Sequence, residues 1–458
     1  MRRVLTYLTC LLFVEENDQC IYALNWISPF GWAHDLFYLK LPYQIRLYDH
    51  VLAVCLVLAL GRPDGKGPRV QPMRSTLLLA LGTIVAWFIY GMARDGSNFR
   101  WGCWQIYLPL SGVLFAFTIA AVYRTPEHYA MLAKAVLVAA AYRAIMCLLY
   151  YYLEIRTSLV KNQEYMTSHD DSVLWVVAIF ILLIRVLRTN RPLERVGALL
   201  FMGVLVFAIQ YNGRRLAWVS LAMGLVVFVL LLPPGSKALR RMKRAVMVMA
   251  PIVGLYVSIG WGRKDAIFKP LAAFSTITTE QDDSTKSRNY ENVGLLTTAR
   301  SNGWLVGTGW GHEYEPLSLK YDLSKVFAIW RYIPHNSILG LLTFMGVLGY
   351  TGYWLTFPTG IFLNSRIAHM AKSQASRDLG IIGVVQMVVC VNQYFGDMGL
   401  FSYKAVYVMG ASYAIALRTP IMAGAWPAGK TRSKAAGQPP AQPPAARGGP
   451  VREDAWQG

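Results

Sequence analysis

Charged side chains are scarce in this chain, because Asp, Glu, Lys and Arg make up only 15% of its 458 residues. Soluble globular domains carry about 25%. The mean hydropathy is +0.36, and the apolar residues gather in blocks of about 17 to 25 residues, the length that crosses roughly 30 Å of hydrocarbon. A soluble protein with one large core is therefore excluded, and the sequence predicts an all-α, polytopic integral membrane protein.

Nucleotide and metal motifs are missing as well. The chain has no phosphate-binding loop, no Rossmann fingerprint and no zinc-type ligand spacing, so an ATP-driven pump has no support, and we expect no metal and no cofactor. Cysteine is infrequent, with six residues, and we expect the four that lie in or beside apolar segments to be buried apolar thiols: Cys55, Cys103, Cys147 and Cys390.

About twelve apolar segments are predicted to span a membrane. They lie at 4–24, 46–61, 75–93, 104–123, 129–153, 172–187, 193–211, 215–232, 245–261, 337–363, 379–396 and 401–418. The first is the weakest, because acidic residues follow its apolar run Val4–Val14. A signal peptide is the rival interpretation, although no small-residue cleavage site follows. Residues 1–261 would thus hold nine spans and residues 337–418 three.

Basic residues outnumber acidic ones by 45 to 25, which gives a net charge of +20. Their distribution argues against a nucleic-acid partner, because Lys and Arg cluster in alternate loops: Arg62–Arg74, Arg185–Arg195, Lys237–Arg244 and Arg366–Arg377. The intervening loops are poorer in Lys and Arg. This is the positive-inside pattern, and it predicts that both termini lie in the cytoplasm.

Two regions break the run of short loops, and both are predicted on the outer side. Residues 15–45 are rich in aromatics, and residues 262–336 form a loop of about 75 residues with mixed charges and Gly-rich turns. We expect this long loop to fold over the membrane face, with short helices in segments such as Leu317–Tyr332. Residues 419–458 are rich in Pro, Ala and Gly, which predicts a disordered cytoplasmic tail.

Four features could carry chemistry. The first is Asn212-Gly213-Arg214-Arg215, which joins two spans on the predicted outer side with almost no loop. Two guanidiniums near a helix N-terminus suit a diphosphate, because Arg offers a planar fork of donors for phosphate oxygens. The alternative is an anchor that reaches the lipid headgroups.

The second feature is Pro334-His335-Asn336-Ser337, where the long loop meets the next span. A histidine there can act as a general base near neutral pH. The alternative is a simple helix cap, made by Asn336 or Ser337, with His335 beside it.

The third feature is Arg143, near the middle of the fifth span. A charge at that depth costs several kcal/mol unless it faces a cavity or a partner, which makes it a functional candidate. The alternative is a structural ion pair, with Asp49 or Asp397 as its partner.

The fourth feature lies within the long loop, where Arg288, Arg300 and Trp304 precede the Gly-rich segment Gly307–Gly311. The arginines could meet phosphates, the tryptophans could stack on sugars, and the glycines allow close backbone approach to a ligand. The alternative is a compact loop held by salt bridges such as Arg288 to Glu291.

Together these features resemble the O-antigen ligase and polymerase family of bacterial membrane proteins. The similarity rests on Gly-Arg-Arg-x-Ala-Trp at 213–218, Arg-x3-Trp-x2-Gly-x-Gly-x-Gly at 300–311, and Pro-His-Asn-Ser at 334–337. It covers residues 200–350. The resemblance implies an inverting, metal-independent glycosyltransferase of the bacterial inner membrane, with its active site facing the periplasm.

The resemblance also implies partners and roles. The donor would be a glycan on undecaprenyl diphosphate, the acceptor a second glycan (polymerase) or the lipid A core (ligase), and polysaccharide assembly proteins could be further partners. Arg214 or Arg215 would hold the diphosphate, with Arg215 favoured because it lies three residues before Trp218. Arg288 and Arg300 would contact phosphate, His335 would be the base, and Asn336 would orient it.

Ligase and polymerase are not separated by the sequence, although an Arg-x10-Gly spacing from Arg300 to Gly311 and the lack of any feature pointing to the lipid A core favour a polymerase slightly. The main alternative from another class is a transporter or flippase for a lipid-linked or anionic glycan, with Arg143 lining its pathway. We find no pair of similar halves of the kind that transporters often show. A scaffold for glycan export is the third reading.

Overall fold

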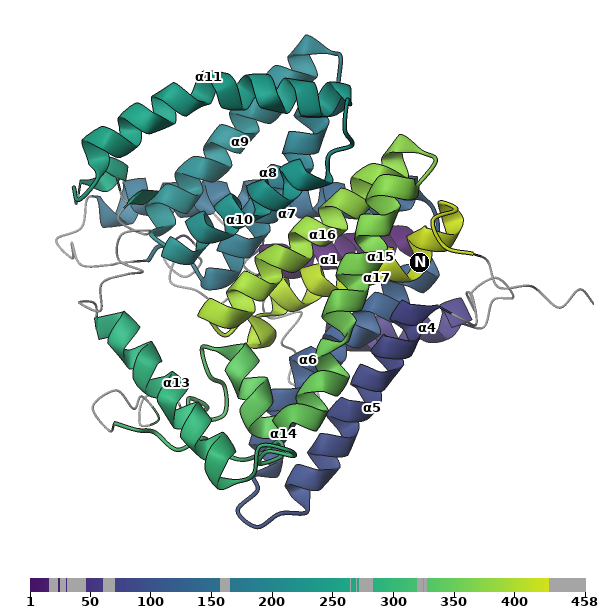
Figure 1. Cartoon of the computed structure of the whole chain (residues 1–458), viewed down its shortest axis with the longest axis vertical. Coiled ribbons are helices and arrows are strands. Elements are labelled where there is room, and N and C mark those ends of the chain that lie inside the picture. The colour runs from purple at the N-terminus through teal and green to yellow at the C-terminus, as the bar shows by residue number, and fades with distance from the viewer. Residues whose placement is uncertain are drawn as a thin grey trace, which may run out of the picture.

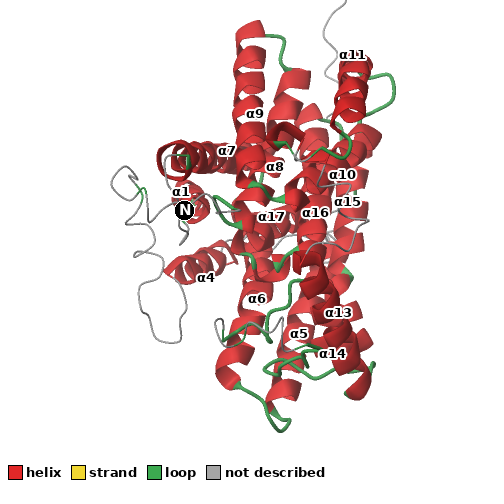
Figure 2. Cartoon of the chain, turned by 90° about the vertical axis from the view of Figure 1, so that its left-hand side faces the viewer, coloured by secondary structure: helices red, strands yellow, loops and turns green. Residues whose placement is uncertain are grey.

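The structure is a computed structural model, and it describes residues 1–15, 24, 30, 47–60, 71–156, 165–263, 265–268, 270–271, 283–318, 324 and 328–427. Within these ranges every regular element is a helix (Figure 2). The α-helices are α1 (Arg2–Val14), α4 (Leu47–Leu60), α5 (Pro72–Met92), α6 (Phe99–Val122), α7 (Pro126–Tyr150), α8 (His169–Arg188), α9 (Pro192–Asn212), α10 (Arg215–Leu231), α11 (Lys237–Gly260), α13 (Asp283–Ser301), α14 (Ser337–Trp354), α15 (Thr356–Met370), α16 (Gln374–Gly396) and α17 (Tyr403–Met422). A π-helical turn, η2 (Tyr151–Ile155), continues α7, and 3-10 turns lie at Ala266–Phe268 and Gly399–Phe401.

Eight helical segments in the described part of the chain are long and apolar enough to cross a membrane, as expected of a multi-pass membrane protein. They are Pro72–Met92, Phe99–Val122, Pro126–Ile155, Pro192–Asn212, Lys237–Gly260, Ser337–Met370, Gln374–Gly396 and Tyr403–Met422. Two further apolar helices are shorter, at Leu47–Leu58 and Arg215–Leu231. The all-α class is therefore confirmed, and the predicted number of about twelve spans exceeds the eight long apolar helices.

The first predicted span is only partly described. Helix α1 has 13 residues, which at about 1.5 Å per residue cover about 20 Å, short of the roughly 30 Å of a hydrocarbon core. The remainder of that segment, at 16–23, lies outside the described residues. So do nearly all of the aromatic segment 15–45 and the tail from residue 428 onward.

Short polar residues fix where the helices begin. Side chains of Gln71, Asn98 and Ser402 accept hydrogen bonds from backbone N–H groups at the starts of α5, α6 and α17. Such caps satisfy donors that have no partner within the helix. Gly213 ends α9 with φ of 70°, a left-handed conformation that favours glycine. The abrupt turn from α9 into α10 follows from that glycine.

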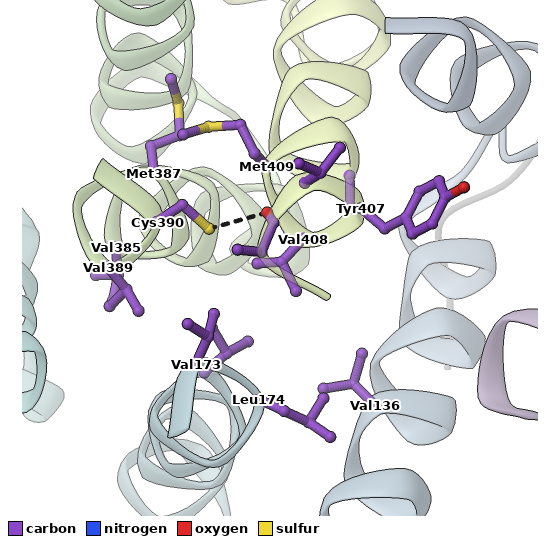
Figure 3. Close-up of a cluster of buried hydrophobic side chains, with 14 of the residues drawn as sticks. Val136, Val173, Leu174, Val385, Met387, Val389, Cys390, Tyr407, Val408 and Met409 are labelled. Carbon is purple, nitrogen blue, oxygen red and sulfur yellow. Dashed lines mark hydrogen bonds between the residues drawn. The ribbon is translucent and has the colours of Figure 1, made fainter. Parts of the chain in front are cut away.

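The core is built around α17, whose side chains are almost all buried, and α6, α16, α15 and α8 pack around it. Figure 3 shows valine, leucine and methionine side chains from α7, α8, α16 and α17 meeting in one apolar cluster. Cys390 lies there and donates a hydrogen bond to the Ala405 carbonyl, 3.3 Å away. Cys55, Cys147 and Cys390 are buried as expected, and Cys103 is partly exposed.

Contacts between loops divide the molecule into two ends. At one, Arg188 pairs with Asp378 (2.7 Å) and Arg366 donates to the Ala425 carbonyl (2.6 Å). Met1 and the last described residues both lie at this end (Figure 1), which we call the termini end. The opposite, loop end gathers residues 93–98, 165–168, 213–214, 397–402 and the described part of 261–336. The described basic clusters Arg185–Arg195, Lys237–Arg244 and Arg366–Arg377 thus lie at the same end, and most of Arg62–Arg74 lies outside the described residues.

The long loop packs tightly on the bundle. Its one long described helix is α13, Asp283–Ser301, which contacts α14 through a hydrogen bond from the Thr343 hydroxyl to the Leu295 carbonyl (3.1 Å). The expectation of short helices at Leu317–Tyr332 is not met where that segment is described, because residues 328–332 form turns. In the described part of the loop, the long helix therefore lies before the glycines.

Candidate functional site

The candidate site lies at the loop end, where α8, α10 and α14 begin and α16 ends. Its centre holds two histidine–carboxylate contacts, His335 with Glu291 and His169 with Asp397. Arg288 adds a cation 4.0 Å from the Asp397 carboxylate. We call these five side chains the loop-end cluster.

His335 is held by Glu291 from helix α13. The Nδ1 atom of His335 lies 2.8 Å from one carboxylate oxygen of Glu291, and the backbone N–H of His335 donates to the other. Only 4% of the Glu291 side chain is exposed, against 19% of the imidazole. An N–H at Nδ1 directed to the carboxylate leaves Nε2 as the proton-accepting nitrogen, which is the tautomer that a general base requires.

The backbone around His335 is fixed on three sides. The Trp330 ring packs edge-on against the imidazole, with ring centroids 4.8 Å apart. The His335 carbonyl accepts a hydrogen bond from the Met398 N–H (2.7 Å), and the Ser337 hydroxyl accepts one from Leu400. Met398 has φ of 48°, which is rare for a residue with a side chain and is a mark of functional or strained sites.

Asn336 caps helix α14, as the alternative for this motif predicted. Its side chain accepts a hydrogen bond from the Leu339 N–H (3.1 Å), and 5% of the residue is exposed. No described contact links its side chain to the imidazole of His335. The residue that contacts the His335 ring is Glu291, whose carboxylate lies 2.8 Å from Nδ1.

Asp397 joins the two halves of the cluster. Burial by itself would raise the pKa of the Asp397 carboxyl, but the nearby charges of His169, Arg288 and His335 lower the pKa below its ordinary value. The carboxylate is therefore ionised at neutral pH. The predicted salt bridge of Arg288 with Glu291 is wrong, because Arg288 approaches Asp397 while Glu291 faces His335.

Arg214 and Arg215 lie beside the cluster but have different surroundings. The Arg214 guanidinium carbon lies 3.5 Å from the centroid of the Tyr165 ring, a cation–π contact between the turn after α9 and the segment before α8. Arg215 is the first residue of α10, partly exposed, and the side chain of the next residue, Leu216, packs against Gly396. The start of α10 therefore lies against the end of α16, the helix that Asp397 follows.

Arg143 lies deeper, inside the bundle. Its guanidinium donates to Asp171 (Nη2 to Oδ2, 2.6 Å), and Lys404 approaches the other oxygen of Asp171 at 2.6 Å. All three side chains are fully buried. The structure thus matches the alternative of a structural ion pair, but the expected partners Asp49 and Asp397 are wrong. Asp49 instead accepts a hydrogen bond from Tyr107.

Arg300 and Trp304 do not join the cluster. Arg300 is twelve residues after Arg288 on α13, which at about 1.5 Å per residue separates them by roughly 18 Å along the helix. Arg300 and Trp304 are both exposed. The structure therefore brings His335 and Arg288 together, with Arg214 and Arg215 beside them, and leaves these two apart.

The glycines of the segment Gly307–Gly311 pack against other parts of the protein. The Thr308 and Gly309 N–H groups donate to carbonyls of Thr343 and Phe344 in α14, and Gly309 lies directly against Gly91 of α5. Gly346, with φ of 59°, breaks α14 where this segment crosses it. Close backbone approach is confirmed as the reason for the glycines, but the partner is the protein's own backbone rather than a ligand.

Sequence reasoning missed His169 as a functional candidate, and it considered Glu291 and Asp397 only as partners in ion pairs. One signal for Glu291 was present, because Arg288 and Glu291 are three residues apart, a spacing that puts both on one helical face. The loop was not expected to be helical there, so the spacing went unused. Among the described residues, no group of three or more His, Cys, Asp or Glu side chains is arranged to hold a metal ion.

The arrangement can hold an anion and move a proton. Arg215 and Arg288 supply positive charge, and His335 has the Glu291 carboxylate behind its ring, which can stabilise a proton taken up at Nε2. No protein family model matches this chain. A search of curated proteins finds no match either.

Proposed function

We propose that this protein is a membrane glycosyltransferase that acts on glycans carried by undecaprenyl diphosphate. The observation that carries the proposal is the His335–Glu291 pair, held beside Arg288 and Asp397 at the same end of the bundle as Arg214 and Arg215. A base and a group of cations within one site suit a reaction that removes a hydroxyl proton and expels a diphosphate.

The chemistry follows from the charges. The acceptor hydroxyl attacks the anomeric carbon, the bond from that carbon to the diphosphate oxygen breaks, and the sugar configuration inverts. His335 accepts the hydroxyl proton at Nε2, and Glu291 stabilises the imidazolium that forms. Arg215 and Arg288 stabilise the negative charge that collects on the leaving diphosphate, because guanidinium donors match phosphate oxygens.

The acceptor decides between polymerase and ligase. We favour a polymerase of O-antigen or exopolysaccharide, because the chain has no feature that points to the lipid A core. A loss of glycan length in an inactive variant supports the polymerase, whereas a loss of glycan attached to lipid A supports the ligase.

Single Ala substitutions of Arg215 and His335 test the proposal in cells, with His312→Ala as a control at the same end of the molecule. After membrane levels are matched, both site variants should lose long glycan chains and accumulate lipid-linked units on the outer side, while the control keeps normal glycan. Normal chain lengths in both site variants would refute the site. Accumulation on the inner side would instead favour a transporter or flippase.

The location that we propose is the bacterial inner membrane, with both termini in the cytoplasm and the loop end in the periplasm. Two exposed positions test this, Glu313 at the loop end and Arg191 at the termini end, whose side chains are 46% and 82% exposed. A membrane-impermeant thiol reagent should label Glu313→Cys in cells with a permeabilised outer membrane. Arg191→Cys should react only after lysis, and the reverse result would invert the topology.

A further inference from the structure

We propose that His169 is a further catalytic residue, which donates a hydrogen bond and then a proton from Nε2 to the leaving diphosphate. The inference rests on the proposed function and deepens it, since it identifies the group that faces the departing end of the donor. His169 is the first residue of α8, and its side chain contacts Asp397 through Nδ1.

The position of His169 links the two halves of the site. On one side, the side chain of Asn212 accepts a hydrogen bond from the Thr167 N–H (2.8 Å), and Arg214 reaches the Thr167 carbonyl. These contacts place the segment before α8 against the turn that carries Arg214 and Arg215. On the other side, Asp397 approaches Arg288, and the next residue, Met398, donates to the His335 carbonyl. His169 therefore lies between the arginine pair and the base.

The exposed fractions of His169 and Asp397 indicate which way the His169 imidazole faces. Only 5% of the Asp397 side chain is exposed, whereas 34% of the His169 side chain is. Because Nδ1 faces the buried carboxylate, Nε2 lies on the opposite side of the ring, toward the exposed face. A donor is thus presented to a ligand, with a carboxylate behind the ring that fixes its orientation.

Other charges surround this histidine. On α8 itself Asp170 and Asp171 follow, on α17 Lys404 pairs with Asp171, and on α13 Arg288 faces Asp397. Arg143 from α7 neutralises part of the charge on Asp171. Since Lys404 and Arg143 both engage Asp171, Asp397 remains the carboxylate in direct contact with His169.

The reaction balances with two histidines. A bond forms between the acceptor oxygen and the anomeric carbon, and the bond from that carbon to the diphosphate oxygen breaks with its electron pair going to the diphosphate. The acceptor proton goes to Nε2 of His335, and a proton from Nε2 of His169 goes to the diphosphate. The exchange of one proton with solvent at each histidine restores the starting state.

Binding of the product tests the role without an assay of turnover. The full-length protein in lipid nanodiscs is titrated with undecaprenyl diphosphate, and with undecaprenol as the phosphate-free probe, from about pH 5.5 to about pH 8, which brackets the ordinary pKa of histidine. The wild type is compared with His169→Gln at each pH, because the diphosphate itself also titrates. A charge-assisted hydrogen bond predicts an affinity ratio of wild type to variant of roughly tenfold at low pH, falling toward one at high pH.

Two variants complete the design. His312→Gln, a histidine at the same end that contacts the Asp95 carbonyl, should bind like the wild type. Asp397→Asn keeps both histidines but removes the carboxylate, and it should lose the low-pH advantage, which tests the proposal independently if His169→Gln proves unstable.

The outcomes separate the two proposals. If the wild type binds undecaprenyl diphosphate no better than undecaprenol, the proposed function fails. If it prefers the diphosphate but both His169→Gln and Asp397→Asn bind it like the wild type at every pH, the role of His169 is overturned and the proposed function stands.

Discussion

The Glu291 carboxylate accepts a hydrogen bond from the backbone N–H of His335 and contacts the His335 imidazole, although the two residues are 44 positions apart in the chain. The carboxylate comes from the middle of α13 and the imidazole from the residue just before the cap of α14. Helix α13 is therefore part of the site rather than a cover over it. The position of His335, the proposed base, therefore depends on how the long loop packs.

Replacement of Glu291 with Gln should lower glycan formation by roughly a hundredfold, within the range that a general base contributes. The amide retains the size of the side chain but cannot stabilise the imidazolium, and it can favour the wrong tautomer of His335. Chain-length distribution of surface glycan and in vitro turnover are the measurements. Glu313→Gln, in a partly exposed pair with Arg331 on the same loop, should have little effect, and equal losses in both variants would argue against a catalytic pair.

The Arg143–Asp171–Lys404 group should contribute strongly to stability. Arg143→Met leaves Asp171 with one cation in a fully buried site, and removal of one partner of a buried pair costs about 3–5 kcal/mol. Thermal unfolding of the purified protein in detergent measures the loss. Arg188→Met, which breaks the more exposed pair with Asp378, should cost about 1 kcal/mol or less. Similar unfolding temperatures for the two variants would contradict this.

Two glycines of helix α5 should respond oppositely to alanine. A methyl group on Gly91 would collide with the backbone of Trp310, whereas one on Gly82 meets no atom within 4 Å. Gly91→Ala should therefore lower stability by about 1–3 kcal/mol through overpacking and expose the long loop to protease. Gly82→Ala should be neutral or gain up to about 1 kcal/mol from helix propensity. Equal rates of proteolysis in the two variants would overturn the contact assigned to Gly91.

Low pH should lower the stability of the folded protein through protonation of Asp397 in the loop-end cluster. Its pKa is lowered in the folded protein from the ordinary 3.8, so the unfolded chain binds a proton more readily than the folded one. The stabilisation is then fully present above the ordinary pKa and is lost as the pH falls through the folded value. The unfolding temperature of the wild type should drop below about pH 4, and that of Asp397→Asn should drop less. Parallel curves for the two proteins would show that Asp397 does not contribute.

The positions of the helices could be predicted from the sequence because they depend on local chemistry. A chain in lipid must satisfy its backbone hydrogen bonds within each spanning segment, so an apolar run of sufficient length predicts a helix wherever it occurs. The alternation of basic clusters likewise predicted which loops share an end. Residues 300–311 show the limit, since their glycines indicated close backbone approach without showing that Gly91 and Thr343 would be the partners.

The sequence by itself therefore determined an all-α membrane protein, the approximate positions of its helices and the candidates His335, Arg215 and Arg288. Only the tertiary structure decided which charges meet: Glu291 with His335, Asp397 with His169, and Asp171 with Arg143. The reason is physical. Helix formation is set by neighbours along the chain, whereas contacts between helices depend on their order, rotation and tilt, which the packing of the whole bundle fixes.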